Sequence, residues 1–144
     1  MNILVVDDEL GTRASLGVVL ALAGHHAVFA IDGEDALKMF DSAEVPFDLI
    51  ITDHAMARVS GLELVRGLRE RGFTGEIVVI TAYAGTIEEE EYKKLQVVGV
   101  MEKPFNIVEL RHWLNCIHGC HVDPSAAEKP EPPRAIDFCW LKRD

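Results

Sequence analysis

Short apolar runs alternate along the chain with segments whose apolar residues recur every three to four positions. Five runs are typical of buried strands: Ile3–Val6, Ala27–Ala30, Leu49–Ile51, Glu76–Thr81 and Val97–Met101. Helical spacing follows the runs, as with Leu16, Val19 and Leu20 after the first. Five strands alternating with five helices imply right-handed crossovers. This pattern predicts an α/β fold, a three-layer sandwich around a doubly wound five-stranded parallel sheet.

Polar residues mark where some of the helices begin. Ser60 and Glu63 have the spacing of a capping box, in which each side chain bonds the other residue's backbone N–H. The same spacing at Thr86 and Glu89 predicts a polar helix from Thr86 to Gln96.

The amino-acid composition of the chain changes near Val122. Residues 1–121 form the predicted domain, and residues 122–144 form a Pro-rich linker and a short tail without an output domain. The apolar stretch 135–141 is too short to fold alone. It could be disordered, or it could dock on the domain or on a partner.

The charge and the apolar runs exclude several classes of protein. The formal net charge is -10, and nearly all of the excess acid lies in residues 1–121, which argues against a general nucleic-acid-binding surface. No apolar run approaches the roughly 20 residues that span a membrane, and no signal peptide precedes Ile3. The three cysteines, at 116, 120 and 139, make no disulfide framework. We therefore expect a cytoplasmic protein without nucleic-acid or membrane partners.

Functional groups follow four of the five predicted strands. The first strand ends at Asp7 and Asp8, the third at Asp53, the fourth at Thr81, and Lys103 follows the fifth. Each alone has an ordinary interpretation, such as a helix cap, a strand-end hydroxyl or a solvated lysine. Ligands of parallel α/β sheets bind beyond the carboxyl ends of the strands. Such groups at the ends of four strands, all at one edge, therefore favour a site.

The residue types at this edge suit phosphoryl transfer. Crowded carboxylates repel one another unless a hard cation such as Mg²⁺, or Mn²⁺ in its place, lies between them. The metal would neutralise phosphoryl oxygens while a carboxylate of Asp53 attacks phosphorus, giving an aspartyl phosphate. Lys103 and Thr81 would bind the remaining phosphoryl oxygens.

Several ordered motifs carry a resemblance to a known family. They are Val5-Val6-Asp7-Asp8-Glu9, Asp32-Gly33 with Ala36-Leu37, Asp48-Leu49-Ile50-Ile51-Thr52-Asp53, Met56, Gly61, Ile80-Thr81-Ala82 and Lys103-Pro104-Phe105. Over residues 2 to about 118 the sequence resembles the receiver domain of bacterial two-component response regulators, of the CheY-like, single-domain kind. The resemblance implies a flavodoxin-like fold with strand order 2-1-3-4-5.

The resemblance also implies roles for individual residues. Asp53 would accept a phosphoryl group from a histidine of a sensor kinase or phosphotransfer protein. Asp8, Asp53 and the backbone carbonyl of Ala55 would hold Mg²⁺, with Asp7 helping through water. The phosphate-binding and switch positions would be Thr81, Ala82 and Lys103. A downstream protein target would bind the face formed by the fourth helix, fifth strand and fifth helix.

Three further positions are candidates for switching or tuning. Val100 stands where the family usually has Tyr or Phe, which puts the usual relay to the target face in doubt. Tyr83 could replace it, or be an ordinary loop tyrosine; with Ala55 it occupies a position that tunes aspartyl-phosphate hydrolysis in the family. Pro104 would follow a cis peptide bond, which an X-Pro bond adopts at small cost.

These observations predict a stand-alone response regulator receiver, a monomer or weak homodimer that switches a partner or relays phosphate. It would be a signalling switch with self-catalysed phosphoryl transfer and hydrolysis, not an enzyme with external substrates. A receiver-like interaction domain that works without phosphate is the alternative, which Val100 keeps open. An aspartate-based phosphatase is disfavoured because Ala55 occupies the position of its general acid.

Overall fold

The five strands form one parallel sheet in the order β2-β1-β3-β4-β5. The computed structural model describes residues 1–82, 85 and 88–120. Its strands are β1 (Asn2–Val6), β2 (His26–Ala30), β3 (Leu49–Asp53), β4 (Glu76–Thr81) and β5 (Gly99–Glu102). The predicted fold class and strand order are both confirmed.

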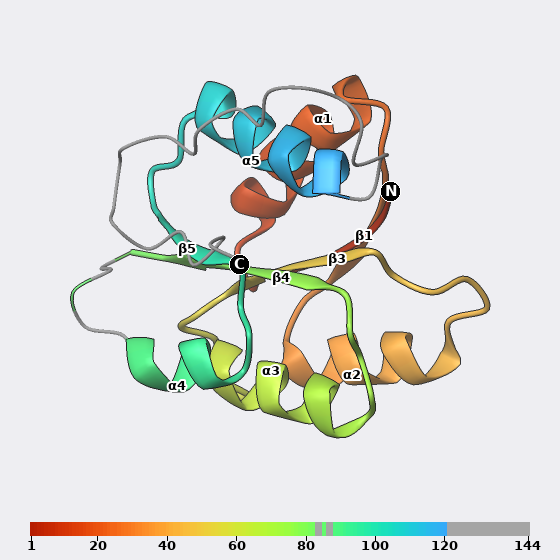
Figure 1. Ribbon diagram of the computed structural model, residues 1–144, viewed down its shortest axis with the longest axis vertical. Coiled ribbons are helices and arrows are strands. Elements are labelled where there is room, and N and C mark those ends of the chain that lie inside the picture. Colours follow the sequence, from red (N-terminus) through yellow and green to blue (C-terminus); the bar gives the residue numbers. More distant parts are fainter. Residues whose placement is uncertain (83–84, 86–87, 121–144) are drawn as a thin grey trace.

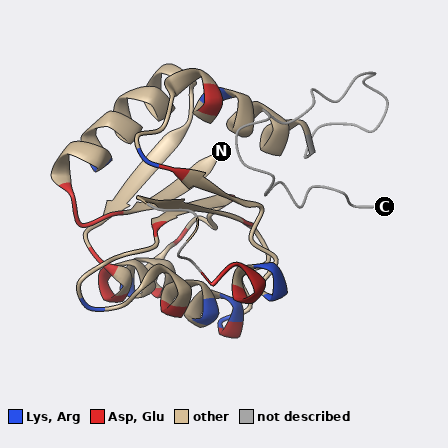
Figure 2. Ribbon diagram, turned by 90° about the vertical axis from the view of Figure 1, so that its left-hand side faces the viewer, with Lys and Arg blue, Asp and Glu red and all other residues tan. Residues whose placement is uncertain are grey.

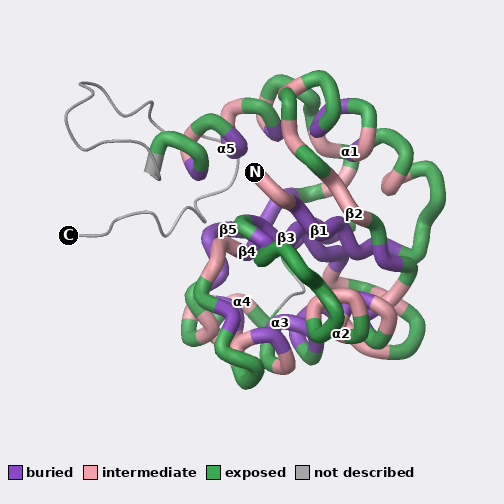
Figure 3. Tube along the Cα trace, turned by 90° about the vertical axis from the view of Figure 1, so that its right-hand side faces the viewer, coloured by how far each residue is buried: buried purple, intermediate pink, exposed green. Residues whose placement is uncertain are grey.

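Two helical layers cover the sheet. One layer contains α1 (Leu10–Leu22) and α5 (Ile107–Cys120), and the other contains α2 (Gly33–Ser42), α3 (Gly61–Glu70) and α4 (Glu89–Lys94) (Figure 1). Successive strand residues point to opposite faces, so Ile3 and Val5 pack in the core beneath α1 and α5. Leu4 and Val6 pack in the core against the other layer. The sheet is therefore the buried centre of the molecule (Figure 3), which explains why its strands are continuous apolar runs.

Local signals fix both ends of α3, and the capping box predicted at its start is confirmed. The Ser60 hydroxyl accepts a hydrogen bond from the Glu63 N–H at 3.2 Å, and the Glu63 carboxylate accepts one from the Ser60 N–H at 2.9 Å. This capping box starts α3 directly after the loop that follows β3. At the other end Gly72 has a φ of 82°, the left-handed conformation that ends helices.

The region around α4 departs from the prediction. The helix runs only from Glu89 to Lys94, and its N-cap Glu88 makes no side-chain cap. Gln96 has a φ of 56°, so the chain leaves the helix before the predicted end. Thr86 lies outside the described residues. The last strand begins at Gly99, two residues later than predicted.

Candidate functional site

Three carboxylates meet at the carboxyl edge of the sheet. Asp7 and Asp8 follow β1, and Asp53 is the last residue of β3. Because β1 and β3 are neighbours, with Val6 paired with Thr52, both strands end at the same level. One carboxylate oxygen from each residue lies within 4.8 Å of the others, and no other group of three potential metal ligands occurs among the described residues. Asp7 and Asp53 are buried and Asp8 is exposed, so the cluster opens to solvent on one side.

Lys103 brings a positive charge to this cluster. Its Nζ atom lies 3.0 Å from Asp7 Oδ2, 3.4 Å from Asp53 Oδ2 and 3.8 Å from Glu9 Oε2. The backbone N–H of Lys103 donates to the Thr81 carbonyl at 2.7 Å. The Lys103–Pro104 peptide bond is cis, as expected. The ammonium group of Lys103 thus forms ion pairs with carboxylates at the ends of two strands, β1 and β3.

The surroundings shift the pKa values of the two central groups. Burial raises the pKa of the Asp53 carboxyl and the charge of Asp7 raises it further, while Lys103 and a backbone hydrogen bond from Ala55 oppose the rise. For Lys103, burial lowers the pKa, but the hydrogen bond to Asp7 and the charges of Asp53 and Asp7 outweigh burial and raise it. Lys103 therefore stays protonated, and Asp53 is a more basic carboxylate than an ordinary aspartate.

Two residues with no predicted role, Glu9 and Arg13, hold Asp7 in place. The Arg13 guanidinium donates to the Asp7 carbonyl at 2.6 Å, and the Glu9 N–H donates to Asp7 Oδ1 at 2.7 Å. Asp7 also donates its N–H to the Ala30 carbonyl at 3.3 Å. With its oxygens already engaged by Glu9 and Lys103, Asp7 suits an indirect part in metal binding. Arg13 has no sequence signal, because its contact depends on how α1 starts.

The remaining predicted site residues have different placements. Thr81 is buried at the end of β4 and Ala82 follows it in an exposed position, both at the edge that carries Asp53. Ala55 is exposed in the loop after β3, two residues beyond Asp53. Val100 lies in the core, 2% exposed, and faces the α2–α4 layer. Tyr83 lies outside the described residues.

A second pair of residues missed from the sequence lies beside the acceptor position. His54 directly follows Asp53, and its Nδ1 atom is 2.7 Å from the hydroxyl of Tyr92 in α4. Tyr92 is fully buried. The sequence of α4 predicts a polar helix, and its pattern contains no signal for a tyrosine directed at the site.

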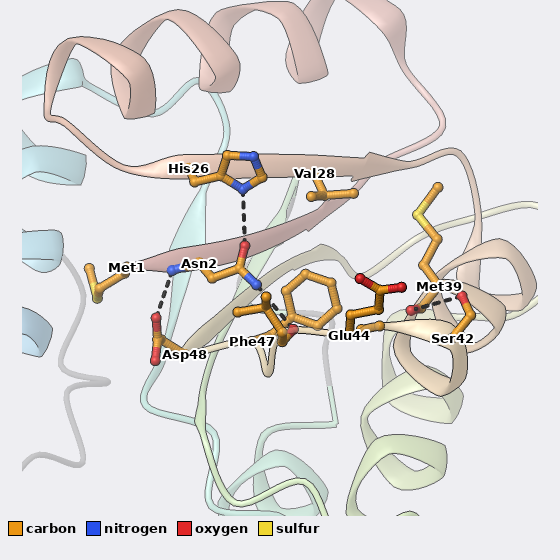
Figure 4. A pocket seen from close by; sticks show the side chains of 11 residues that line it. Met1, Asn2, His26, Val28, Met39, Ser42, Glu44, Phe47 and Asp48 are labelled. Atoms are coloured by element: carbon orange, nitrogen blue, oxygen red, sulfur yellow. Dashed lines mark hydrogen bonds between the residues drawn. The ribbon is translucent and has the colours of Figure 1, made fainter.

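A separate pocket of about 820 Å³ lies at the opposite edge of the sheet. It is lined by residues from β1 and β2, from the carboxyl-terminal part of α2 and from the segment between α2 and β3 (Figure 4). Asn2 spans one side, with its N–H donating to Asp48 Oδ2 at 2.6 Å and its side-chain oxygen 3.1 Å from His26 Nδ1. The acid cluster lies at the ends of the strands, so this pocket is not part of the candidate site.

Comparison with known proteins assigns the chain to a family. Residues 3–115 match the model of the response regulator receiver domain. The chain therefore belongs to the response regulator receiver domain family, whose members are signalling switches of two-component systems. The resemblance inferred from the motifs is confirmed.

Individual relatives agree with this assignment. A probable transcriptional regulatory protein of a Picosynechococcus species is 34% identical over an alignment of 114 residues, and the match covers 76% of this chain and 45% of the relative. The chain thus spans about half the length of the curated relatives it matches.

Solved structures show the same fold. The chemotaxis protein CheY4 of Vibrio cholerae is 30% identical, with a TM-score of 0.74 over 81% of this chain and 97% of that chain. The response regulator TrrA of Thermotoga maritima, solved in complex with Mg²⁺ and BeF, is 33% identical, with a TM-score of 0.72 and the same coverage.

In the part of the chain that the structure describes, no helix has the length and apolar character needed to cross a membrane.

Proposed function

We propose that Asp53 accepts a phosphoryl group from a phosphohistidine of a sensor kinase or phosphotransfer protein. The observation that carries the proposal is the convergence of Asp7, Asp8 and Asp53, with Lys103 within ion-pair distance of Asp7 and Asp53. An acid cluster alone is common, but a protonated lysine held 3.4 Å from a buried carboxylate places a cation where a transferred group would bear negative charge.

In this step a carboxylate oxygen of Asp53 attacks phosphorus as the phosphorus–nitrogen bond to the donor histidine breaks. The electron pair stays on the imidazole nitrogen, which takes up a proton, and the product is an aspartyl phosphate. The raised pKa of Asp53 favours its role as nucleophile, and Lys103 would move from the carboxylate toward a phosphoryl oxygen. Thr81, at the end of the neighbouring strand, would donate its hydroxyl to another oxygen.

The donor set of the cluster fits a divalent metal. Asp8, Asp53 and the Ala55 carbonyl would hold Mg²⁺, or Mn²⁺, and Asp7 would act through water. The exposed face at Asp8 leaves room for the waters that Mg²⁺ retains. When bound, the metal would neutralise phosphoryl oxygens during transfer.

A protein donor is supported by the surface around the site. Leu10 opens α1 directly after the acid motif and is 72% exposed, and Ile107 and Val108 open α5 at 56% and 74%. Arg13 is the sole charged residue of α1, and the layer formed by α1 and α5 carries far less charge than the α2–α4 layer (Figure 2). Exposed apolar side chains beside a reactive site suit contact with another protein.

Turnover of external phosphate esters is not supported, because Ala55 offers no general acid at the second position after Asp53. Use of the face of α4, β5 and α5 by a protein target remains a proposal, as does the absence of nucleic-acid contact. A phosphate-independent interaction domain is the second candidate. The buried Val100 favours it, because this side chain lacks the aromatic ring that the resemblance implies at this position and that would move together with Thr81.

Intact-mass spectrometry after incubation with Mg²⁺ and acetyl phosphate tests the proposal. We expect one phosphoryl adduct on the wild type, none on Asp53→Asn, and none on the wild type when EDTA removes the metal. Asp41→Asn is the matched control, since Asp41 is an exposed aspartate of α2 outside the site. An equal adduct on Asp53→Asn would refute the assignment. No adduct on the folded wild type, either with acetyl phosphate or with a phosphohistidine protein, would favour the phosphate-independent domain.

A further inference from the structure

Tyr92 is the one side chain of α4 that is buried, and it reaches toward His54 in the loop that follows β3. Its hydroxyl lies 2.7 Å from His54 Nδ1, with the ring centroids 5.7 Å apart and the rings at 69°. Burial, and then the charges of Glu88 and Asp53, raise the pKa of Tyr92 far above its usual value. The side chain therefore stays a phenol that can donate a hydrogen bond.

The second nitrogen of His54 indicates the direction of that bond. Nε2 lies 3.7 Å from Glu88 Oε2, the position of an N–H facing a carboxylate. With the proton on Nε2, Nδ1 is the acceptor and Tyr92 the donor. A buried hydroxyl is costly without a partner, so Tyr92 has to remain where this nitrogen can accept from it.

The backbone ties His54 to the acceptor segment. His54 is the residue after Asp53, and its N–H donates to the Ile80 carbonyl at 2.8 Å. Its own carbonyl accepts from the Gly61 N–H at 2.9 Å, so the residue is held between β4 and the start of α3. Any shift of the backbone at Asp53 or Ala55 therefore moves the imidazole as well.

Other described contacts hold α4 mainly through its outer face and its carboxyl end. Arg66 of α3 pairs with Glu91 at 2.9 Å on the exposed side. Arg69 donates to the carbonyls of Leu95 at 2.9 Å and Gln96 at 3.1 Å, just beyond the helix. The described side-chain contacts between α4 and the residue after Asp53 are thus the Tyr92 hydroxyl on His54 Nδ1 and, at the start of the helix, Glu88 beside His54 Nε2.

We infer that Tyr92 is a positioning residue that couples α4, through His54, to the occupancy of Asp53. The inference rests on the proposed function and deepens it. Val100 lies in the same core cluster as Tyr92, at the strand position where the family resemblance implies an aromatic residue. A phosphoryl group and metal would repack the loop that follows Asp53, and a buried hydrogen bond turns a small loop shift into movement of the helix. The aromatic group of the relay is therefore supplied by α4.

Tyr92→Phe removes the hydroxyl and keeps the ring. We would measure hydrogen–deuterium exchange of the α4 amides, Glu89–Lys94, with and without Mg²⁺ and beryllofluoride, alongside the phosphoryl adduct by mass. In the wild type, loading the site should change α4 exchange. In Tyr92→Phe that change should fall about fivefold or more, the lower range of measured coupling factors, while the adduct still forms.

Two variants separate coupling from simple loosening of the helix. Arg66→Gln removes the exposed pair with Glu91 and should keep the wild-type response. His54→Asn retains a polar side chain near the position of Nδ1 and should keep more of the α4 response than His54→Ala. This comparison tests the coupling even if Tyr92→Phe folds poorly. A full response in Tyr92→Phe, an equal loss in Arg66→Gln, or no α4 response in a loaded wild type would each overturn the coupling. Absence of any adduct on the wild type would instead count against the proposed function.

Discussion

Lys103→Met removes the positive charge from the acid cluster while keeping a side chain of similar length. In the wild type, Nζ lies 3.0 Å from Asp7 Oδ2 and 3.4 Å from Asp53 Oδ2. At an effective dielectric constant of about 20, the attraction across 3.4 Å is about 5 kcal/mol before desolvation is subtracted. Breaking a buried pair by removing one partner costs about 3–5 kcal/mol. Lys103 is one-fifth exposed, so we expect a loss at or just below the lower end of this range, about 2–3 kcal/mol.

The loss of unfolding free energy in Lys103→Met should depend on pH in a defined direction. The folded-state pKa of Asp53 is raised by burial and by Asp7, and opposed by Lys103, so ionising this carboxyl disfavours the fold. Protonated Asp53 makes its full contribution to the free energy of unfolding below the pKa of an ordinary, unfolded-state aspartate. That contribution is lost as the pH rises through the pKa of Asp53 in the folded protein. Removing Lys103 raises the folded pKa of Asp53 further. The deficit of Lys103→Met should therefore be greatest above that pKa and shrink on acidification.

Urea unfolding followed by circular dichroism, without metal and at several pH values, measures this deficit. With a slope of about 1–3 kcal/mol per molar urea, the midpoint at neutral pH should fall by about 1–2 M. Lys38→Met is the matched control, because Lys38 pairs with Glu34 on an exposed helix face and should show no measurable change. An unchanged midpoint for Lys103→Met, or a deficit that widens on acidification, would refute the reasoning.

Two further changes test the metal site and the packing beneath it. Mg²⁺ at about a hundredfold its Kd should stabilise the wild type by about 2.7 kcal/mol and raise its thermal midpoint, but leave Asp8→Asn unchanged; equal stabilisation of both would contradict a metal site at Asp8. Gly61→Ala should lower the free energy of unfolding by about 1–3 kcal/mol, because the new Cβ would collide with the Asp53 carbonyl. In the control Gly11→Ala the added Cβ meets nothing within 4 Å, so in denaturant unfolding this variant should be as stable as the wild type or up to about 1 kcal/mol more stable. Equal effects of the two substitutions would contradict the collision at Gly61.

Local chemistry explains which parts of the fold could be predicted. The capping box at Ser60 and Glu63 depends on residues three positions apart, so the start of α3 follows from the sequence alone. The extent of α4 does not follow from the sequence alone. The chain leaves this helix where Gln96 takes a left-handed conformation, and Arg69, 27 positions earlier in the chain, donates to the Gln96 carbonyl. A helix anchored by distant groups gives little periodic signal of its own.

The sequence by itself determined the order of strands and helices, the residue types at the strand ends, and hence that Asp7, Asp8, Asp53 and Lys103 would share one edge. Those features follow from apolar periodicity and from the shared direction of parallel strands. Only the tertiary structure decided that Lys103 lies between two carboxylates and that His54 meets Tyr92, residues 38 positions apart. Distances between side chains on separate elements depend on how those elements pack, and packing is a property of the whole core that local sequence patterns do not contain.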